Sequence, residues 1–106
     1  MTRVRQRIDP EILNSAASVI RCLGHPLRLR LLEALESGER SVSELQVLSE
    51  APQATVSEQL GVLRGQNIVG ARREGPFVYY RILEPKVSRI LACIRGCETP
   101  PGRRNP

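Results

Sequence analysis

Three cysteines are the residues of this sequence best suited to chemistry. Cys93 and Cys97 stand four positions apart, and Cys22 lies far earlier in the chain. On a helix, side chains four positions apart share one face, so both thiols could reach a single ion. Thiolates prefer soft metals and metalloids, and three sulfurs around one As(III) form a chemically sensible site. The sequence therefore predicts a site for As(III) or another thiophilic ion, with Cys22 as the only available third donor.

The same thiols have other interpretations. Three is an odd number of cysteines and too few for a disulfide scaffold. In a reducing compartment, unpaired thiols bind soft metals, sense oxidants or fill space. The commonest fate of a free cysteine is to pack as a small buried hydrophobe. Inert packing is the favoured interpretation of Cys22 alone, whereas ion binding and inert packing both stay open for Cys93 and Cys97.

The chain has few of the residues from which catalytic sites are usually formed. Its single histidine is His25 and its single aspartate is Asp9, so a Ser-His-Asp or Cys-His-Asp set lacks members. His25 precedes Pro26, which favours a helix cap over a metal ligand. No carboxylate is evident that could orient His25 toward Cys22. We therefore expect no enzyme and no required cofactor.

Length, charge and hydropathy indicate which kinds of partner this chain can bind. A chain of 106 residues lies in the size range of one domain, and a domain this small is often completed by a second copy. A formal charge of +5 favours an anionic partner, either nucleic acid or a membrane surface. No apolar run approaches the roughly 20 residues of a membrane span, and no apolar stretch follows residues 1–7 to make a signal peptide. We expect a cytoplasmic protein that does not enter the membrane.

Four prolines mark expected helix starts, because proline suits the first helical position. They are Pro10, Pro26, Pro52 and Pro85. The spacing of apolar residues predicts helices over about 10–22, 26–38, 52–64 and 85–97. A further short helix is expected after Ser41, because Ser41 and Glu44 have the spacing of a capping box.

The apolar pattern changes period after residue 67. Two runs rich in strand-forming residues, 68–73 and 77–82, flank Glu74-Gly75-Pro76 and predict a hairpin. The expected order is therefore α-α-α-α-β-β-α. Residues 1–8 are expected to form a basic arm, residues 9–98 the folded domain, and residues 99–106 a disordered basic tail.

This order predicts a mainly α winged helix-turn-helix with a β-hairpin wing. A recognition helix needs short polar side chains near its N-terminus to reach base edges and phosphates in the major groove of double-stranded DNA. The helix that starts near Pro52 carries four of them: Gln53, Thr55, Ser57 and Gln59. A wing needs cations that contact phosphates, and Arg72 and Arg73 beside Gly75 supply them.

Two apolar stripes predict a homodimer. The first lies on the first helix and the second on the last, and together they are more apolar than a small monomer can cover. Their members are Ile12, Ala16, Val19, Ile20, Val87, Ile90, Leu91 and Ile94. We expect the two copies to meet through the first and last helices.

Several segments resemble the ArsR/SmtB family of bacterial metal-sensing repressors. They are LGHPLRLRLL at 23–32, SEL at 43–45, QATVSEQLGVLR at 53–64 and VYY at 78–80. The similarity covers roughly residues 12–97. It implies a homodimeric winged-helix repressor that leaves its operator when an inducer binds.

The chain also departs from that family. Glu58 stands where the family usually has a histidine, and we predict no DNA contact for it because a carboxylate repels phosphate. The arsenic-sensing branch commonly carries Cys-x-Cys in the third helix, but residues 44–48 contain no thiol. The zinc-sensing branch uses histidines and carboxylates on the last helix, where this chain has Lys86 and Cys97. These departures leave Cys22, Cys93 and Cys97 as the candidate ligands.

Two alternative functions stay open at this point. Sulfide-sensing members of the family resemble a design with one cysteine in the second helix and one in the last. The second helix here has none, which weakens a redox or sulfide response without excluding it. The other alternative is a non-sensing DNA-binding or interaction module whose cysteines are inert.

Overall fold

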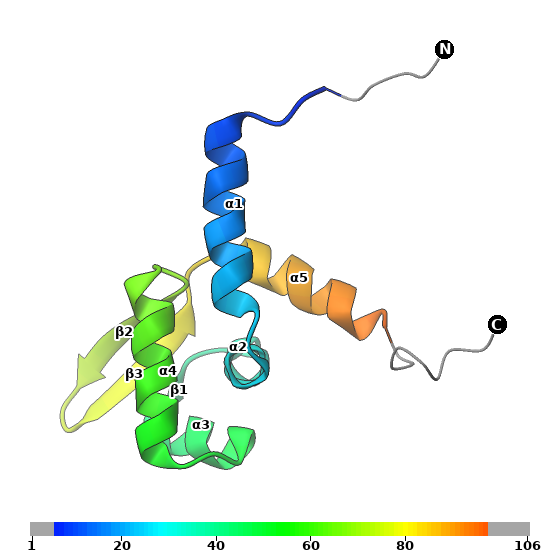
Figure 1. Ribbon diagram of the computed structural model, residues 1–106. Helices are drawn as coiled ribbons and strands as arrows, with labels where there is room; N and C mark the ends of the chain where they lie inside the picture. The colour runs from blue at the N-terminus through cyan, green and yellow to red at the C-terminus, as the bar shows by residue number, and fades with distance from the viewer. Residues whose placement is uncertain (1–5, 98–106) are drawn as a thin grey trace.

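The computed structural model describes residues 6–97, which form five helices and three strands (Figure 1). In chain order these are α1 (Pro10–Leu23), α2 (Pro26–Leu35), β1 (Arg40–Ser41), α3 (Val42–Ser49), α4 (Gln53–Gly65), β2 (Val69–Glu74), β3 (Phe77–Ile82) and α5 (Lys86–Arg95). Residues 1–5 of the expected arm and the whole expected tail, 99–106, lie outside the described part. The predicted winged helix-turn-helix is confirmed. No helix in the described part is long and apolar enough to cross a bilayer.

Local chemistry sets the helix starts. Pro10 and Pro26 are the first helical residues as predicted, whereas α4 and α5 begin one residue after Pro52 and Pro85. The Asp9 carboxylate accepts a hydrogen bond from the Glu11 amide over 2.8 Å, and Nδ1 of His25 accepts one from the Leu27 amide over 3.2 Å. His25 is therefore a helix cap. Ser41 and Glu44 form the full capping box, each side chain accepting from the other's backbone amide.

The sheet has one strand more than the hairpin that the sequence predicted. Its order is β1-β3-β2, and all pairs are antiparallel. In β1, Arg40 pairs with Tyr80 and Ser41 with Tyr79. Two residues are too few to show a strand period, and their partners lie far along the chain, so the sequence pattern could not reveal β1. Gly75 turns the hairpin with φ of 60°, a conformation that glycine adopts without strain.

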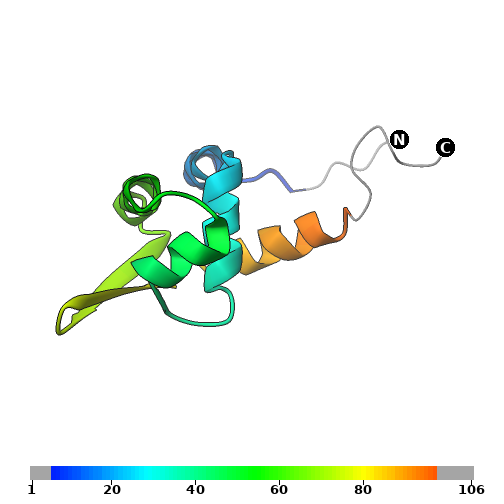
Figure 2. The same cartoon turned by 90° about the horizontal axis from the view of Figure 1, so that it is seen from below.

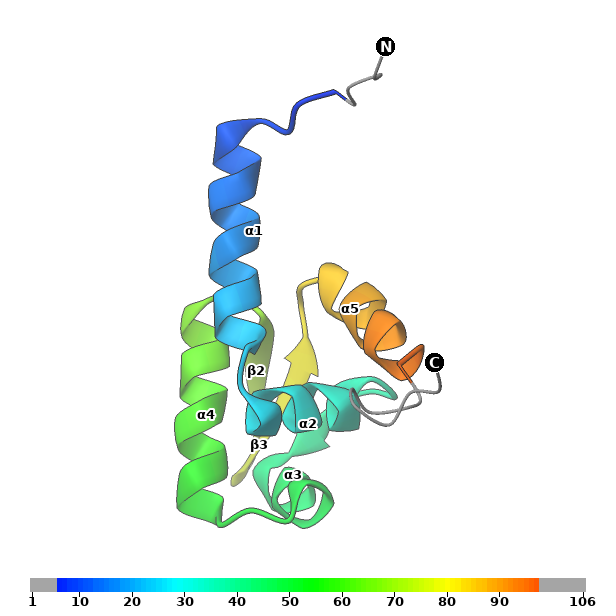
Figure 3. The same cartoon turned by 45° about the vertical axis from the view of Figure 1, so that its right-hand side comes forward.

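One hydrophobic core joins the helices to the root of the hairpin. Its largest fully buried side chains come from α2, α3, α4, the α4–β2 connection, β2 and α5: Leu31, Leu32, Leu45, Val56, Leu60, Leu63, Ile68, Val69 and Val87. Full burial of each such side chain stabilises the fold by roughly 1.5–3 kcal/mol relative to exposure. The core therefore fixes α4 against α2 and α3, and Figure 3 shows α2 between α4 and α5.

The two terminal helices are covered very differently by the rest of the protomer. Most of α1 stands away from the body in Figures 1 and 3. Ile12 and Ile20 are 60% and 63% exposed. On α5, by contrast, Val87 and Leu91 are buried in the protomer's own core, and Ile94 is exposed. The expectation that the whole α5 stripe faces a partner is therefore wrong for Val87 and Leu91.

Candidate nucleic-acid interface and thiol cluster

The N-terminal end of α4 and the tip of the hairpin lie toward the same end of the molecule (Figure 1). Seen from below, the hairpin and α5 extend from opposite sides of the body (Figure 2). Gln53 and Ser57 are exposed on α4, and Thr55 is half-buried. Pro52 provides no side-chain cap for this helix, so its first amides are available to an anion such as a phosphate. The arrangement suits an approach of DNA along α4 and the hairpin.

Gln59 does not belong to that exposed set. Its side chain is buried, and its Oε1 accepts a hydrogen bond from Nε of Arg28 over 2.7 Å. Nη1 of Arg28 also donates to the carbonyl oxygen of Cys22 over 2.9 Å. The structure thus places Gln59 away from the exposed side of α4 for which the DNA contact was predicted. The sequence held a signal for this, because position 59 follows Val56 by three and precedes Leu63 by four on the inward face of α4.

The two wing arginines have different surroundings. Nε of Arg72 donates to Glu39 over 2.9 Å, and its guanidinium also pairs with Glu74 and lies 4.9 Å from the ring centroid of Tyr79. Hydrogen bonds from Arg72 to both carboxylates raise the pKa of Arg72 above its ordinary value. Arg73 is exposed and forms no ion pair with any residue between 6 and 97. Of these two arginines, only Arg73 is therefore free of carboxylate partners among residues 6–97.

The three thiols occupy two kinds of environment. Cys22 is buried near the end of α1 at 6% exposure. Cys93 lies on α5 and Cys97 just beyond it, both exposed, with Sγ of Cys97 3.8 Å from the carbonyl oxygen of Cys93. Among residues 6–97, no three His, Cys, Asp or Glu side chains gather where they could hold one ion. A single protomer therefore offers two accessible soft donors and does not bring Cys22 to them.

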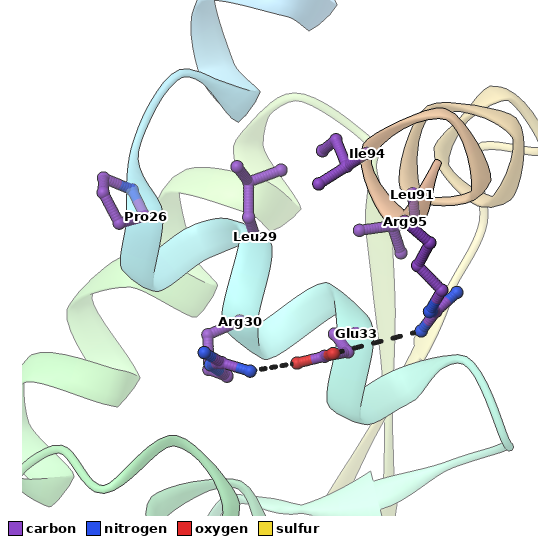
Figure 4. Close-up of a pocket in the computed structure, with 7 residues that line it drawn as sticks. All are labelled: Pro26, Leu29, Arg30, Glu33, Leu91, Ile94 and Arg95. Carbon is purple, nitrogen blue, oxygen red and sulfur yellow. Dashed lines mark hydrogen bonds and ion pairs between the residues drawn. The ribbon is translucent and has the colours of Figure 1, made fainter. Parts of the chain in front are cut away.

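Ion pairs and a cavity share the boundary between α2 and α5. Arg95 on α5 pairs with Glu36 at the end of α2 and reaches Glu33 at 4.0 Å. The hydrogen bond from Arg95 lowers the pKa of Glu36 below its ordinary value. Beside these pairs lies a cavity of about 330 Å³, drawn in Figure 4. It is lined by Pro26, Leu29, Arg30, Glu33, Leu91, Ile94 and Arg95. Side chains of α2 and α5 therefore do not fill the space between the two helices at this point.

Comparison with known proteins decides the family. The model of the bacterial regulatory protein arsR family matches residues 25–70. The biofilm growth-associated repressor of Agrobacterium fabrum is 42% identical over 78 residues, which are 74% of this chain and 67% of that protein. The chain belongs to the arsR family. It is a transcriptional regulator of the winged helix-turn-helix type, within a family of DNA-binding regulators rather than enzymes.

Solved structures of ArsR-family proteins share this fold. The transcriptional repressor BigR from Xylella fastidiosa superposes with a TM-score of 0.77 at 37% identity, over 81% of this chain and 88% of that one. A homodimeric winged helix-turn-helix DNA-binding domain from Mycobacterium bovis, a possible ArsR-family regulator, gives 0.72 at 31% identity, over 90% of each chain.

The family match covers some parts of the candidate site and not others. Residues 25–70 run from the cap of α2 into β2, so they include α3 and α4 of this ArsR-family chain. The wing arginines and all three cysteines lie outside that segment. Family membership therefore supports the DNA-reading helix, whereas any role for the thiols is argued from their own chemistry.

Proposed function

We propose that this ArsR-family chain is a homodimeric repressor of an operator in double-stranded DNA, released by a thiophilic ion that binds Cys93 and Cys97. The observation that carries the proposal is the accessible pair of thiols at the end of α5. Thiolates select soft ions, and As(III) is the favoured one because three sulfurs and a lone pair complete its coordination. The protein would act in the cytoplasm, where thiols stay reduced.

The dimer is supported by the uncovered face of α1. Ile12, Leu13 and Ile20 are each at least 50% exposed, and α1 packs against the body only near its C-terminal end. A second copy that covers these side chains removes apolar surface from water. The homodimeric relative from Mycobacterium bovis is consistent with this assembly. Two copies related by a two-fold axis would present two recognition helices to a symmetric operator.

Ion binding is proposed to act through the position of α5. Cys93 and Cys97 supply two sulfurs, and Cys22, from either protomer, is the proposed third ligand. One protomer does not bring its own three thiols together, so binding of its own Cys22 as the third ligand requires movement of helices. The cavity between α2 and α5 is the space into which α5 is proposed to move. The ion then favours a dimer whose recognition helices no longer match successive grooves, and this differential affinity releases the DNA.

A titration of the preformed protein–operator complex tests the proposal. Arsenite, cadmium, zinc and an oxidised sulfur donor are added separately while fluorescence anisotropy of labelled DNA is followed. We expect arsenite to release the DNA at the lowest concentration. Release by the sulfur donor alone would establish a redox or sulfide response instead, and no release by any of them would indicate inert cysteines.

A further inference from the structure

Adjacent arginines of the wing point to opposite faces of the sheet. Side chains alternate along a strand, and directly paired residues of neighbouring strands share a face. Arg72 pairs with Tyr79 and Gly70 with Arg81, so Arg72, Tyr79 and Arg81 lie on one face. Arg73 pairs with Val78 and lies on the other face.

Glu39 lies on the same side as Arg72. Its two carboxylate oxygens accept from Nε of Arg72 over 2.9 and 3.0 Å, and Oε2 lies 3.9 Å from Nη1 of Arg81. One carboxylate thus reaches an arginine on each strand of the hairpin. Glu39 directly precedes β1, which is itself hydrogen-bonded to β3. The ion pairs therefore fasten the hairpin to the connection between α2 and β1.

Arg72 is held from three directions. Glu39 and Glu74 bind its guanidinium, and the ring of Tyr79 lies beneath it. A phosphate that approached Arg72 would meet these carboxylates, which lie beside the same guanidinium and repel the phosphate. Arg72 is therefore poorly placed to neutralise DNA, although its residue type suggested that role.

The surroundings of Arg73 leave its side chain accessible, unlike those of Arg72. It shares its sheet face with Val69, which is buried in the core, and β2 packs against α4. Toward the tip of the hairpin this face leaves the core, and Arg73 is exposed there without an ion pair among the described residues. Its guanidinium is thus available on the face of the hairpin that continues from α4.

We infer that Arg72 and Glu39 form a latch that positions the wing, and that Arg73 is the wing residue that binds the DNA phosphate. The inference deepens the proposed function and rests on it for the role of Arg73. The latch itself is a property of the free protein. Arg72 is a positioning residue in this assignment, since it acts through the orientation of the hairpin.

The first test measures the latch without DNA. Backbone ¹⁵N relaxation is recorded for the full chain and for three variants, Arg72→Met, Glu39→Ala and Arg73→Met. We expect order parameters at Glu74, Gly75 and Phe77 to fall from about 0.85 toward 0.6 in the first two variants and to stay unchanged in Arg73→Met. Unchanged order parameters in Arg72→Met and Glu39→Ala would overturn the latch, whether or not the protein binds DNA.

The second test measures the salt dependence of operator affinity. Arg72→Met and Arg73→Met make the same charge change at neighbouring positions and so control for each other. Arg73→Met should reduce the magnitude of the slope of log association constant against log salt concentration. The expected reduction is about 0.9 per lost phosphate contact, and so about 1.8 for a dimer. Arg72→Met should weaken binding roughly two- to fivefold with the slope unchanged. A smaller salt slope in Arg72→Met would overturn the assignment of Arg72 as a positioning residue. A wild-type protein that binds no duplex would contradict the proposed function, and the relaxation test would then decide the latch by itself.

Discussion

Nε of Arg28 donates a hydrogen bond to Oε1 of Gln59 over 2.7 Å, which joins α2 to the recognition helix α4. The same guanidinium holds the carbonyl oxygen of Cys22 at the end of α1. Three helices thus meet at one side chain. The orientation of α4 depends on this polar contact as well as on the apolar core, because a buried amide is stable only while it is hydrogen-bonded.

Replacing Gln59 should therefore affect stability. Gln59→Ala leaves Nε of the part-buried Arg28 guanidinium without its acceptor, so we expect a loss on the order of 1–3 kcal/mol in the free energy of unfolding. Urea unfolding measures it. Gln53→Ala is the matched control, since Gln53 is exposed on the same helix and its replacement should change stability by less than about 0.5 kcal/mol. Equal losses for the two variants would contradict the role of Gln59.

The sequence predicted those features that depend on neighbouring residues. The caps at Asp9 and His25 and the capping box at Ser41 follow from chemistry within three or four positions. Contacts across the fold were not predictable in this way. Gln59 meets Arg28 from 31 positions away, and Arg72 meets Glu39 from 33. Residue type alone assigned both Gln59 and Arg72 to DNA. The apolar spacing of α4 already indicated an inward position for Gln59, whereas only its folded partners indicate another role for Arg72.

Base recognition should reside in the exposed residues of α4. We expect Ser57→Ala or Gln53→Ala to lower operator affinity by about 1–3 kcal/mol while affinity for random duplex changes little. The reason is that base contacts specify sequence, whereas phosphate contacts act on any duplex. Competition binding with both duplexes at one salt concentration gives the ratio of operator affinity to random-duplex affinity. A uniform loss on both duplexes would show that these side chains do not read bases.

The exposed face of α1 should hold the dimer together. Ile20→Asp places a charge in the proposed interface, so we expect the protein to become monomeric at micromolar concentration in sedimentation velocity. Val47→Asp is the control, because Val47 is 75% exposed on α3, away from the proposed interface. A wild-type protein that sediments as a monomer, or an unchanged dimer in Ile20→Asp, would contradict the proposed assembly.

The pair of Arg95 and Glu36 should make the anchoring of α5 depend on pH. Because Arg95 lowers the pKa of Glu36 in the folded protein, the pair stabilises the fold above the ordinary glutamate pKa of roughly 4.3. This contribution is lost as the pH falls through the folded pKa. The difference in Tm between wild type and Glu36→Gln should therefore be largest at about pH 6 and shrink as the pH falls below roughly 4.3. A difference in Tm that stays constant as the pH falls would exclude this cause.

The response to arsenite of variants lacking the α5 thiols tests the central claim most directly. Operator complexes of wild type, the Cys93→Ser/Cys97→Ser double variant and Cys22→Ser are titrated with arsenite. The double variant should bind the operator like wild type and stay bound, because no soft donor remains at α5. Cys22→Ser should respond at a higher arsenite concentration, since two thiols remain. If the double variant releases the operator at the same arsenite concentration as wild type, the ion binds elsewhere and the account is contradicted.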